Sequence, residues 1–434
     1  MAAQPVERRA GTRRGLVVLL LLATLVRLPL LLTPGFDVVA YKIWARVVYA
    51  VGISGAYGAD YPPEPGSAPY HYGPVYLHIL RATGLLYIAL RPGGDWHDQL
   101  LAALLKLSPV VAELLLGLLI WSFLQTRVTA NAALTATAAY LFTPGLIWNT
   151  AYWGGIDAFQ ALFITAALLA TVGSATTLAW PLATLAVCAK LTALPGALAV
   201  VPGALRTRSP RGLALATLAA SATALLVVSP IILYGQANTL LGGIFGHLDI
   251  YAETSFNTHN LWWLVTWGQG TLPDTTVVAF GLDYRMVGRA LFIVAAAPAL
   301  FLLWRLPADA PRLFATSAYL TFAFCMLTTG VHENWAYTLF APLLLAAALD
   351  RRYRPLYAAL AVTFLVNLFL EDPPLHRFVA DWLTVRYAIR AARLLNAVAQ
   401  CALLGWWIWL LCGEMIARNG VVEGQEVEAG KTAG

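Results

Sequence analysis

Long apolar runs separated by short polar or basic segments dominate the chain. A run of about 18 or more apolar residues is long enough to cross the hydrocarbon core of a membrane as a helix. Taking the runs between basic segments predicts about twelve membrane-spanning helices. The expected spans are residues 15–33, 99–124, 130–147, 157–173, 177–189, 191–205, 212–234, 286–304, 312–329, 335–349, 355–370 and 389–412. The predicted fold class is all-α, a polytopic transmembrane helix bundle.

Three partly apolar segments do not fit this count, and they are predicted to lie at the outer membrane surface. Residues 72–90 begin with YHYGP and carry His78 and Arg81, so they are expected to form an amphipathic helix along the membrane. Residues 257–267 and 372–382 are expected to lie at the same surface. The stretch around Lys190 is short for two full spans, and Pro195 disfavours helical geometry at the residue before it. A helix break is therefore predicted near Lys190.

Composition and charge support a membrane protein and suggest its orientation. Apolar residues make up 59% of the 434 residues and charged residues only 12%, with a mean hydropathy of +0.69. The net charge of +6 comes from Lys and Arg gathered in short loops and at the ends, which is typical of cytoplasmic loops. Both termini are thus expected in the cytoplasm and no nucleic-acid partner is implied. Residues 15–32 lack a small-x-small cleavage site after them and are interpreted as an uncleaved first span.

The same orientation places all seven histidines on the outer face, so any chemistry is expected there. The four cysteines lie inside apolar stretches without CxxC or Cys/His spacing, and are interpreted as buried apolar residues. The chain has neither a P-loop nor a GxGxxG motif. The sequence therefore predicts neither a metal site nor a cofactor, and argues against a soluble nucleotide substrate.

Asp37 follows the first span in the stretch TPGFDVVAYKIW. One interpretation is that it caps the next helix by accepting from orphan backbone amides. The other is functional, because a carboxylate at the membrane boundary usually has a role in the protein's activity. In that role Asp37 would act as a general base toward a hydroxyl group.

Two further stretches carry charges with a structural and a functional interpretation each. In AYWGGIDAFQ, Asp157 either caps a helix or orients a cation or a sugar hydroxyl, next to the aromatic Trp153. Lys190 is a lone cation in the apolar stretch CAKLTALPG. It either extends its ammonium group to the membrane surface or binds a phosphate. Lys106 and Glu113, seven positions apart, are expected to pair with other spans rather than with each other.

Polar residues also gather in two later outer segments. In TTGVHENWAY, His332 is either a buried histidine satisfied by backbone or a donor to an anion, and Glu333 is favoured as a cap of the following helix. In SFNTHNLWWL, the residues Asn257, His259 and Asn260 suit sugar hydroxyls, although a plain polar loop is an equal alternative.

Taken in order, these stretches resemble the GT-C superfamily of integral-membrane glycosyltransferases. The similarity is greatest to bacterial mannosyltransferase-like proteins related to the GPI mannosyltransferases, and is looser to dolichol-phosphate-glucose-dependent glucosyltransferases. It covers residues 15–350, and so implies a catalytic module over 1–350 with its first outer loop at 34–98. The C-terminal spans at 351–418 and a polar, disordered cytoplasmic tail at 419–434 would follow.

The resemblance implies an inverting hexosyltransferase in the plasma (inner) membrane, with its active site on the extracytoplasmic side. The donor would be a polyprenyl-phosphate sugar, by analogy mannose, and the acceptor a lipid, glycan or protein hydroxyl. Asp37 matches the family's catalytic base, and Lys190 and His332 match its donor phosphate ligands. A second phosphate contact is expected from Arg81 or Arg285, because the late motif VHEN lacks a following basic residue. The expected sugar or acceptor ligands are Trp153, Asp157, Tyr72, Asn257, His259, Asn260 and Glu333.

Two other functions are compatible with the sequence. The main alternative is a transporter or a flippase of lipid-linked sugars, although such proteins commonly show internal repeats and charges near the membrane midplane, and no repeat is found here. The second is a non-catalytic subunit of an assembly complex of the cell envelope.

Overall fold

The computed structural model describes residues 6–207, 209–268, 270–306, 309–374, 376 and 383–432, and these are almost entirely helical. In the first half the helices are α1 (Val6–Leu31), α2 (Val38–Gly55), α3 (Pro74–Leu90), α4 (Gln99–Leu124), α5 (Ala130–Leu141), α6 (Pro144–Ile147), α7 (Asp157–Val172), α8 (Thr176–Ala189), α9 (Leu194–Ala197), α10 (Val200–Thr207) and α11 (Pro210–Leu233). They are followed by α12 (Ala237–Ile250), α13 (Leu261–Val265), α14 (Tyr284–Arg305), α15 (Ala310–Leu327), α16 (Phe340–Leu349), α17 (Arg354–Leu370) and α19 (Leu383–Thr432). A hairpin of β1 (Val277–Ala279) and β2 (Leu282–Asp283) precedes α14. Short turns of 3-10 or π-helix are η1 (Ala56–Gly58), η2 (Trp148–Trp153), η3 (Leu191–Ala193), η4 (Trp335–Leu339) and η5 (Arg351–Tyr353).

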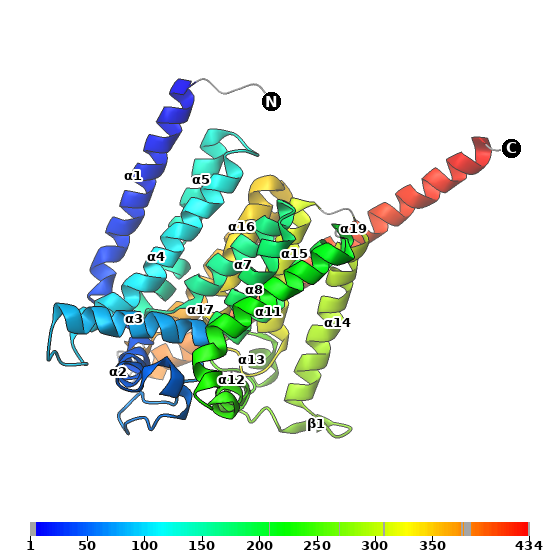
Figure 1. The fold of residues 1–434 in the computed structure, drawn as a ribbon. Coiled ribbons are helices and arrows are strands. Elements are labelled where there is room, and N and C mark those ends of the chain that lie inside the picture. The colour runs from blue at the N-terminus through cyan, green and yellow to red at the C-terminus, as the bar shows by residue number, and fades with distance from the viewer. Residues whose placement is uncertain are drawn as a thin grey trace.

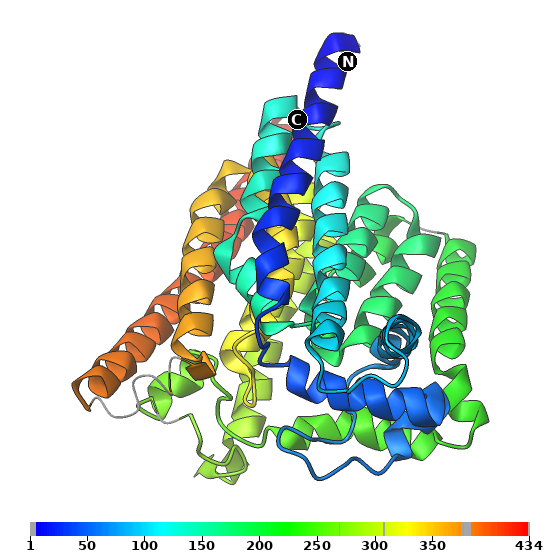
Figure 2. The same cartoon turned by 90° about the vertical axis from the view of Figure 1, so that its left-hand side faces the viewer.

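Most helices form a bundle that is closed at one end by helices lying across it (Figure 1). Helices α3 and α12 run nearly perpendicular to the bundle axis, and Figure 2 shows α2 in a similar crosswise position below α1 and α4. The β-hairpin lies at this end too. Helix α1 begins and α19 ends at the opposite end. We call the end with the crosswise helices the capped end.

The chain is an integral membrane protein. Within the described residues, eight helices are long and apolar enough to cross a membrane by length and composition. These are Thr12–Leu31, Val38–Gly58, Gln99–Leu124, Pro210–Leu233, Tyr284–Arg305, Ala310–Leu327, Arg351–Leu370 and Val385–Gly413. Shorter apolar helices lie at Pro74–Leu90, Asp157–Val172, Thr176–Ala189 and Trp335–Leu349. Seven of the predicted spans fall on seven of these eight helices, whereas the eighth, Val38–Gly58, lies in the segment predicted as the first outer loop. Three more predicted spans match shorter helices, and 130–147 and 191–205 are each divided between short helical pieces. The number of spans remains a prediction.

The segments expected at the surface behave differently from one another. Helix α3 has the crosswise orientation predicted for residues 72–90 (Figure 1). Residues 257–267 form only the five-residue helix α13 and loop structure. Much of 372–382 lies outside the described residues. Helix α19 continues to Thr432 and so includes most of the tail for which composition predicted disorder.

The predicted break at Lys190 is confirmed. Helix α8 ends at Ala189, and Lys190 is extended with φ −158° and ψ 131°. The 3-10 turn η3 follows, and α9 starts with Pro195 in its first turn, where the missing N–H costs no hydrogen bond. The Lys190 side chain at this break is buried, 3% exposed.

A buried ion pair joins the first span to the rest of the bundle. Arg27 on α1 donates Nε and Nη2 to the two Glu113 oxygens of α4, at 3.0 and 2.8 Å, and both side chains are inaccessible to solvent. Thr150 donates to the same carboxylate at 2.6 Å, and Arg27 also reaches the Leu141 carbonyl. Glu113 thus pairs with another span, as predicted.

Removing one partner of this pair is expected to be strongly destabilising. Arg27→Leu leaves the Glu113 carboxylate buried without its cation, which costs about 3–5 kcal/mol. Arg27→Leu combined with Glu113→Leu removes both charges and should recover most of that loss. Thermal unfolding in detergent measures both variants, and equal stability of the single variant and the wild type would contradict the prediction.

Candidate functional site

The exit of α1 from the bundle is held in place by a lysine on α4. Lys106 donates from Nζ to the Leu30 carbonyl at 3.0 Å, and to the carbonyl and hydroxyl of Thr33 at 2.7 and 3.1 Å. These acceptors include carbonyl groups at the C-terminal end of the helix, which a cation satisfies and stabilises. Lys106 therefore fixes the segment that leads directly to Asp37.

Asp37 is also held through its backbone. Its N–H donates to the Trp153 carbonyl at 3.3 Å. This close approach depends on Gly35 and Gly154, because a Cβ on either would come within 2.6 Å of Val38, and Gly154 has a left-handed φ of 89°. Gly35 and Gly154 therefore help to position the first outer loop.

Three acidic residues were open to interpretation as helix caps, and none of them acts as one. Asp37 precedes α2 but its side chain makes no capping hydrogen bond. Asp157 is the first residue of α7, where Ile156 occupies the N-cap position, and its carboxylate accepts from other side chains. Asn334, not Glu333, precedes η4, and no side chain caps that turn. The capping interpretation of Glu333, which the sequence favoured, is wrong.

The Asp37 carboxyl is half-buried and weakly solvated. The Tyr41 hydroxyl donates to its Oδ2 at 3.4 Å. Burial raises the pKa of Asp37 to about 7, and the nearby Lys190 ammonium opposes this shift while the Glu333 and Asp157 carboxylates add to it. The carboxyl group therefore titrates near neutral pH, in the range that suits a general base.

Lys190 and Asp157 form a buried ion pair. The Lys190 Nζ donates to Asp157 Oδ1 at 2.8 Å, and the side chains are 4% and 0% exposed. Gln160 donates to the same oxygen at 2.7 Å and Asn149 to the other oxygen at 3.2 Å. Asp157 thus accepts three hydrogen bonds and orients the lysine, which is one of the two roles the sequence predicted.

The Lys190 ammonium still has capacity to bind a ligand. It carries three hydrogens, and among the described residues only Asp157 accepts one. Its Nζ lies 5.2 Å from the centre of the Tyr72 ring and 5.9 Å from that of Trp335. Aromatic faces stabilise the positive charge without using its hydrogens.

His332 lies in an aromatic cage next to this lysine. Its ring centre is 4.2 Å from Tyr251, 4.3 Å from Phe256 and 5.7 Å from Trp335. Nδ1 is 3.5 Å from Glu333 Oε2, while Nε2 is buried without a hydrogen-bond partner among the described residues. A histidine satisfied by backbone, the structural alternative, is not what is found. We call Asp37, Tyr72, Asp157, Lys190, His332 and Glu333 the central cluster.

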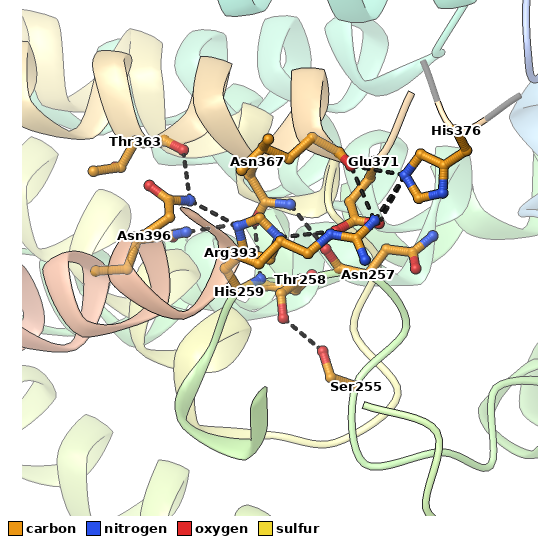
Figure 3. A network of polar contacts seen from close by, with 12 residues as sticks. Ser255, Asn257, Thr258, His259, Thr363, Asn367, Glu371, His376, Arg393 and Asn396 are labelled. Atoms are coloured by element: carbon orange, nitrogen blue, oxygen red, sulfur yellow. Dashed lines mark hydrogen bonds and ion pairs between the residues drawn. The ribbon is translucent and has the colours of Figure 1, made fainter. Parts of the chain in front are cut away.

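A separate buried network fixes the loop that reaches His332 (Figure 3). His259 accepts from Asn396 Nδ2 at Nδ1 (2.9 Å), so its Nε2 donates to Glu371 at 2.8 Å. Burial, with a contribution from Arg393, lowers the pKa of His259 to about 3, so the ring is neutral. Arg393 donates to the other Glu371 oxygen at 2.7 Å, and Asn367 binds the His259 N–H and the Asn257 carbonyl. These contacts join the loop to α17 and α19.

The residues of SFNTHNLWWL therefore divide by role. His259 has both ring nitrogens occupied within the network, and Asn260 caps α13 by accepting from Trp262 and Trp263. Asn257, with a positive φ of 67°, forms a backbone bridge with His332, and its side chain has no hydrogen-bond partner in the described part of the chain. Of the three, only Asn257 has a side chain available to a ligand beside the central cluster.

Two other predicted residues lie outside the central cluster. Arg81 on α3 donates to the carbonyls of Val48 and Tyr49, so it binds α3 to α2. The Trp153 ring is buried, and its Nε1 donates to Asp372 at 2.8 Å. Its contribution to the site is the carbonyl that holds Asp37.

Several residues that complete the site were not predicted from the sequence. Tyr251, Phe256 and Trp335 form the His332 cage, yet aromatic residues near a membrane surface are routine. Gln160 lies one turn after Asp157 on α7, a spacing at which two side chains on a helix meet. That spacing alone could have drawn attention to it.

An apolar pocket lies beside the break at Lys190. It has a cavity volume of about 280 Å³ and is lined by side chains of α8, α9, α10 and α11. Its lining includes Trp180, Val187, Cys188, Leu194 and Val201. Leu194 and Val201 are exposed at the surface of the bundle. The pocket therefore opens at the side of the bundle, and its lining includes Cys188, two positions before Lys190 in the sequence.

Side chains suited to metal binding do not gather in the described part of the chain: no group of three or more His, Cys, Asp or Glu lies together. Comparison with models of known protein families finds no match to this chain, and comparison with curated proteins finds none either.

Proposed function

We propose that the protein is an inverting glycosyltransferase that moves a hexose from a polyprenyl-phosphate donor to an acceptor hydroxyl. The observation that carries the proposal is a titratable carboxyl group near a buried ammonium group that can still donate hydrogen bonds to a ligand. Asp37 titrates near neutral pH, and the buried Lys190 ammonium beside it keeps two hydrogens without an acceptor among the described residues. Both belong to the capped end, which we assign to the extracytoplasmic side.

The reaction needs few groups because a phosphate-linked sugar already has a good leaving group. Asp37 accepts the proton of the acceptor hydroxyl while that oxygen attacks the anomeric carbon from the face opposite the phosphate. The bond between the anomeric carbon and the phosphate oxygen breaks, and the electron pair leaves with the phosphate. Lys190 and the Nε2 of His332 donate to the phosphate oxygens as negative charge accumulates there. The products are a glycosylated acceptor with inverted configuration and free polyprenyl phosphate.

The surroundings of the cluster support a lipid-linked donor. The apolar pocket of α8 to α11 offers hydrocarbon-like surface next to Lys190, as an isoprenoid chain requires. Tyr72 and Trp335 present aromatic faces beside the ammonium, and Asn257 adds a free amide. A phosphate at Lys190 would thus have its lipid on one side and its sugar on the other.

A transporter or flippase is the second candidate, since a buried ion pair in a helix bundle also suits a transport pathway. The two functions differ in product. Purified protein in lipid is incubated with polyprenyl-phosphate-mannose and, separately, polyprenyl-phosphate-glucose, with a membrane extract as acceptor source. Mass spectrometry that finds one donor converted to polyprenyl phosphate supports the transferase. Movement of intact donor between leaflets without conversion supports the flippase.

The rate of transfer should depend on pH through Asp37. A base must be ionised, so activity is expected to fall as the pH drops through about 7, the pKa set by burial. The Tyr41 hydroxyl stabilises the ionised form, so Tyr41→Phe should move the half-maximal point to higher pH. Rates measured from pH 5 to 9 check both expectations. A flat profile in the wild type would exclude Asp37 as the titrating base.

A further inference from the structure

A second pocket opens at the capped end, between the start of α14 and the segment that carries His332, and its lining includes charged side chains. Its cavity volume is about 90 Å³, and its lining includes Tyr251, Asp274, Arg285, Arg289, Phe324 and Trp335. Tyr251 and Trp335 are also walls of the His332 cage. The pocket is therefore a neighbour of the central cluster, separated from it by two aromatic side chains.

The charged side chains of this pocket are one ion pair and one further arginine, which could bind an anion. Arg285 donates Nε and Nη2 to Asp274 at 2.9 and 2.8 Å, and Thr329 donates to the same carboxylate at 2.9 Å. Asp274 is 3% exposed and Arg285 19%, so the pair is fixed. Arg289 lies one turn further along α14 on the same face. It is exposed and has no ion-pair or hydrogen-bond partner among the described residues. Among the described side chains that line the pocket, Arg285 is paired with Asp274, and Arg289 adds a further positive charge.

The position of the pocket indicates which kind of anion it could bind. Arg285 and Arg289 belong to the first turns of an apolar helix long enough to span the membrane, which is the level of lipid headgroups. An arginine there commonly extends to the headgroup region without any specific ligand. Here, however, Arg289 faces a pocket with a fixed ion pair and aromatic walls. Guanidinium groups bind phosphate oxygens strongly, and a phosphodiester carries one negative charge, which would pair with Arg289.

We infer that this pocket binds the phosphodiester of an anionic lipid, and that this lipid is the acceptor. The inference rests on the proposed function. Two observations favour the acceptor over the donor. Trp335 lines the pocket and also lies 5.9 Å from the Lys190 ammonium, which the proposed function already assigns to the donor phosphate. The Asp37 carboxylate contributes to the raised pKa of the Tyr251 hydroxyl, behind burial as its main cause. A headgroup held against Tyr251 thus lies within electrostatic reach of the base.

The binding arm of the test does not need any transfer. Native mass spectrometry of detergent-purified protein measures retention of phosphatidylglycerol against phosphatidylcholine, whose phosphodiester is balanced by choline. Loss of one charge-assisted hydrogen bond weakens binding about tenfold or more, so Arg289→Gln should lose the preference while Arg289→Lys keeps most of it. The matched control is Arg305→Gln at the other end of α14, which should behave as wild type.

Two outcomes of this arm would overturn the inference. Equal retention of phosphatidylglycerol by Arg289→Gln and Arg305→Gln would show that the arginine only reaches the headgroup region. Complete displacement of the lipid by an equal concentration of inorganic phosphate would assign the pocket to free phosphate. Because Arg289 is exposed, a thermal unfolding scan is expected to show normal folding of each variant.

The transfer arm separates this inference from the proposed function. In the donor assay, Arg289→Gln should raise the acceptor concentration that gives the half-maximal rate. The donor concentration that gives the half-maximal rate should stay unchanged. A rise for the donor alone would reassign the pocket to the donor phosphate and overturn the inference. If the wild type converts no donor, the proposed function fails, whereas the lipid-binding result stands by itself.

Discussion

Asp37→Asn is expected to reduce sugar transfer by about 10²- to 10⁴-fold, the range associated with loss of a general base. The amide is nearly the same size as the carboxylate and can still accept from Tyr41, so the local structure should persist. The backbone bond to Trp153 does not depend on the side chain. Donor consumption measured by mass spectrometry, at equal amounts of purified protein, gives the result.

The matched control for this variant is Asp95→Asn. Asp95 belongs to the same outer loop but is exposed, and within the described parts of the chain its carboxylate accepts only from the nearby His97 N–H. It should transfer sugar at the wild-type rate. Wild-type activity in Asp37→Asn would remove Asp37 from the reaction, and with it the proposed mechanism.

The second large effect is expected at the buried pair of Lys190 and Asp157. Lys190→Met alone leaves Asp157 buried and unpaired, which destabilises the protein by about 3–5 kcal/mol and would confound any loss of activity. Combining it with Asp157→Asn removes both charges and keeps the hydrogen-bonding shape of the acidic side chain. This double variant should fold but lose about 10²–10³-fold in transfer.

Thermal unfolding and the donor assay together separate the two roles of the pair. Lys190→Arg preserves the cation and should keep more activity than the double variant. A double variant that folds and transfers sugar at the wild-type rate would show that Lys190 has only a structural role. The same result would leave the donor phosphate without its proposed main ligand.

The helices could be predicted from the sequence because each depends on a local property, the length of an apolar run between basic segments. The break at Lys190 was predictable for the same reason, since Pro195 acts on its own neighbourhood. Helix capping could not be predicted from the local sequence, because an acidic residue that caps a helix and one that binds a ligand occupy the same position before an apolar run. Asp157 precedes an apolar helix as a cap would, yet its carboxylate binds a lysine 33 positions away.

The sequence indicated which residues belong to the candidate site better than it indicated how they contact one another. Asp37, Lys190 and His332 stood out as charged or titratable residues near membrane boundaries. His259 looked equally suitable, but its partner Glu371 lies 112 positions later, beyond the reach of any local pattern. The aromatic cage of His332 carried no signal at all, because each of its members is an ordinary residue for a membrane surface.

The network of Figure 3 also has a consequence for the order in which parts of the site can form during synthesis. The contacts that hold Asp37 and Lys190 are complete within the first 190 residues, apart from the ring contact to Trp335. The loop beside His332 is instead anchored by Asn367, Glu371, Arg393 and Asn396. A nascent chain that has not yet inserted α17 and α19 therefore has its base in place but lacks the fixed loop at His332. Under the proposed function, we therefore expect ribosome-bound chains to be inactive until these last two helices enter the membrane.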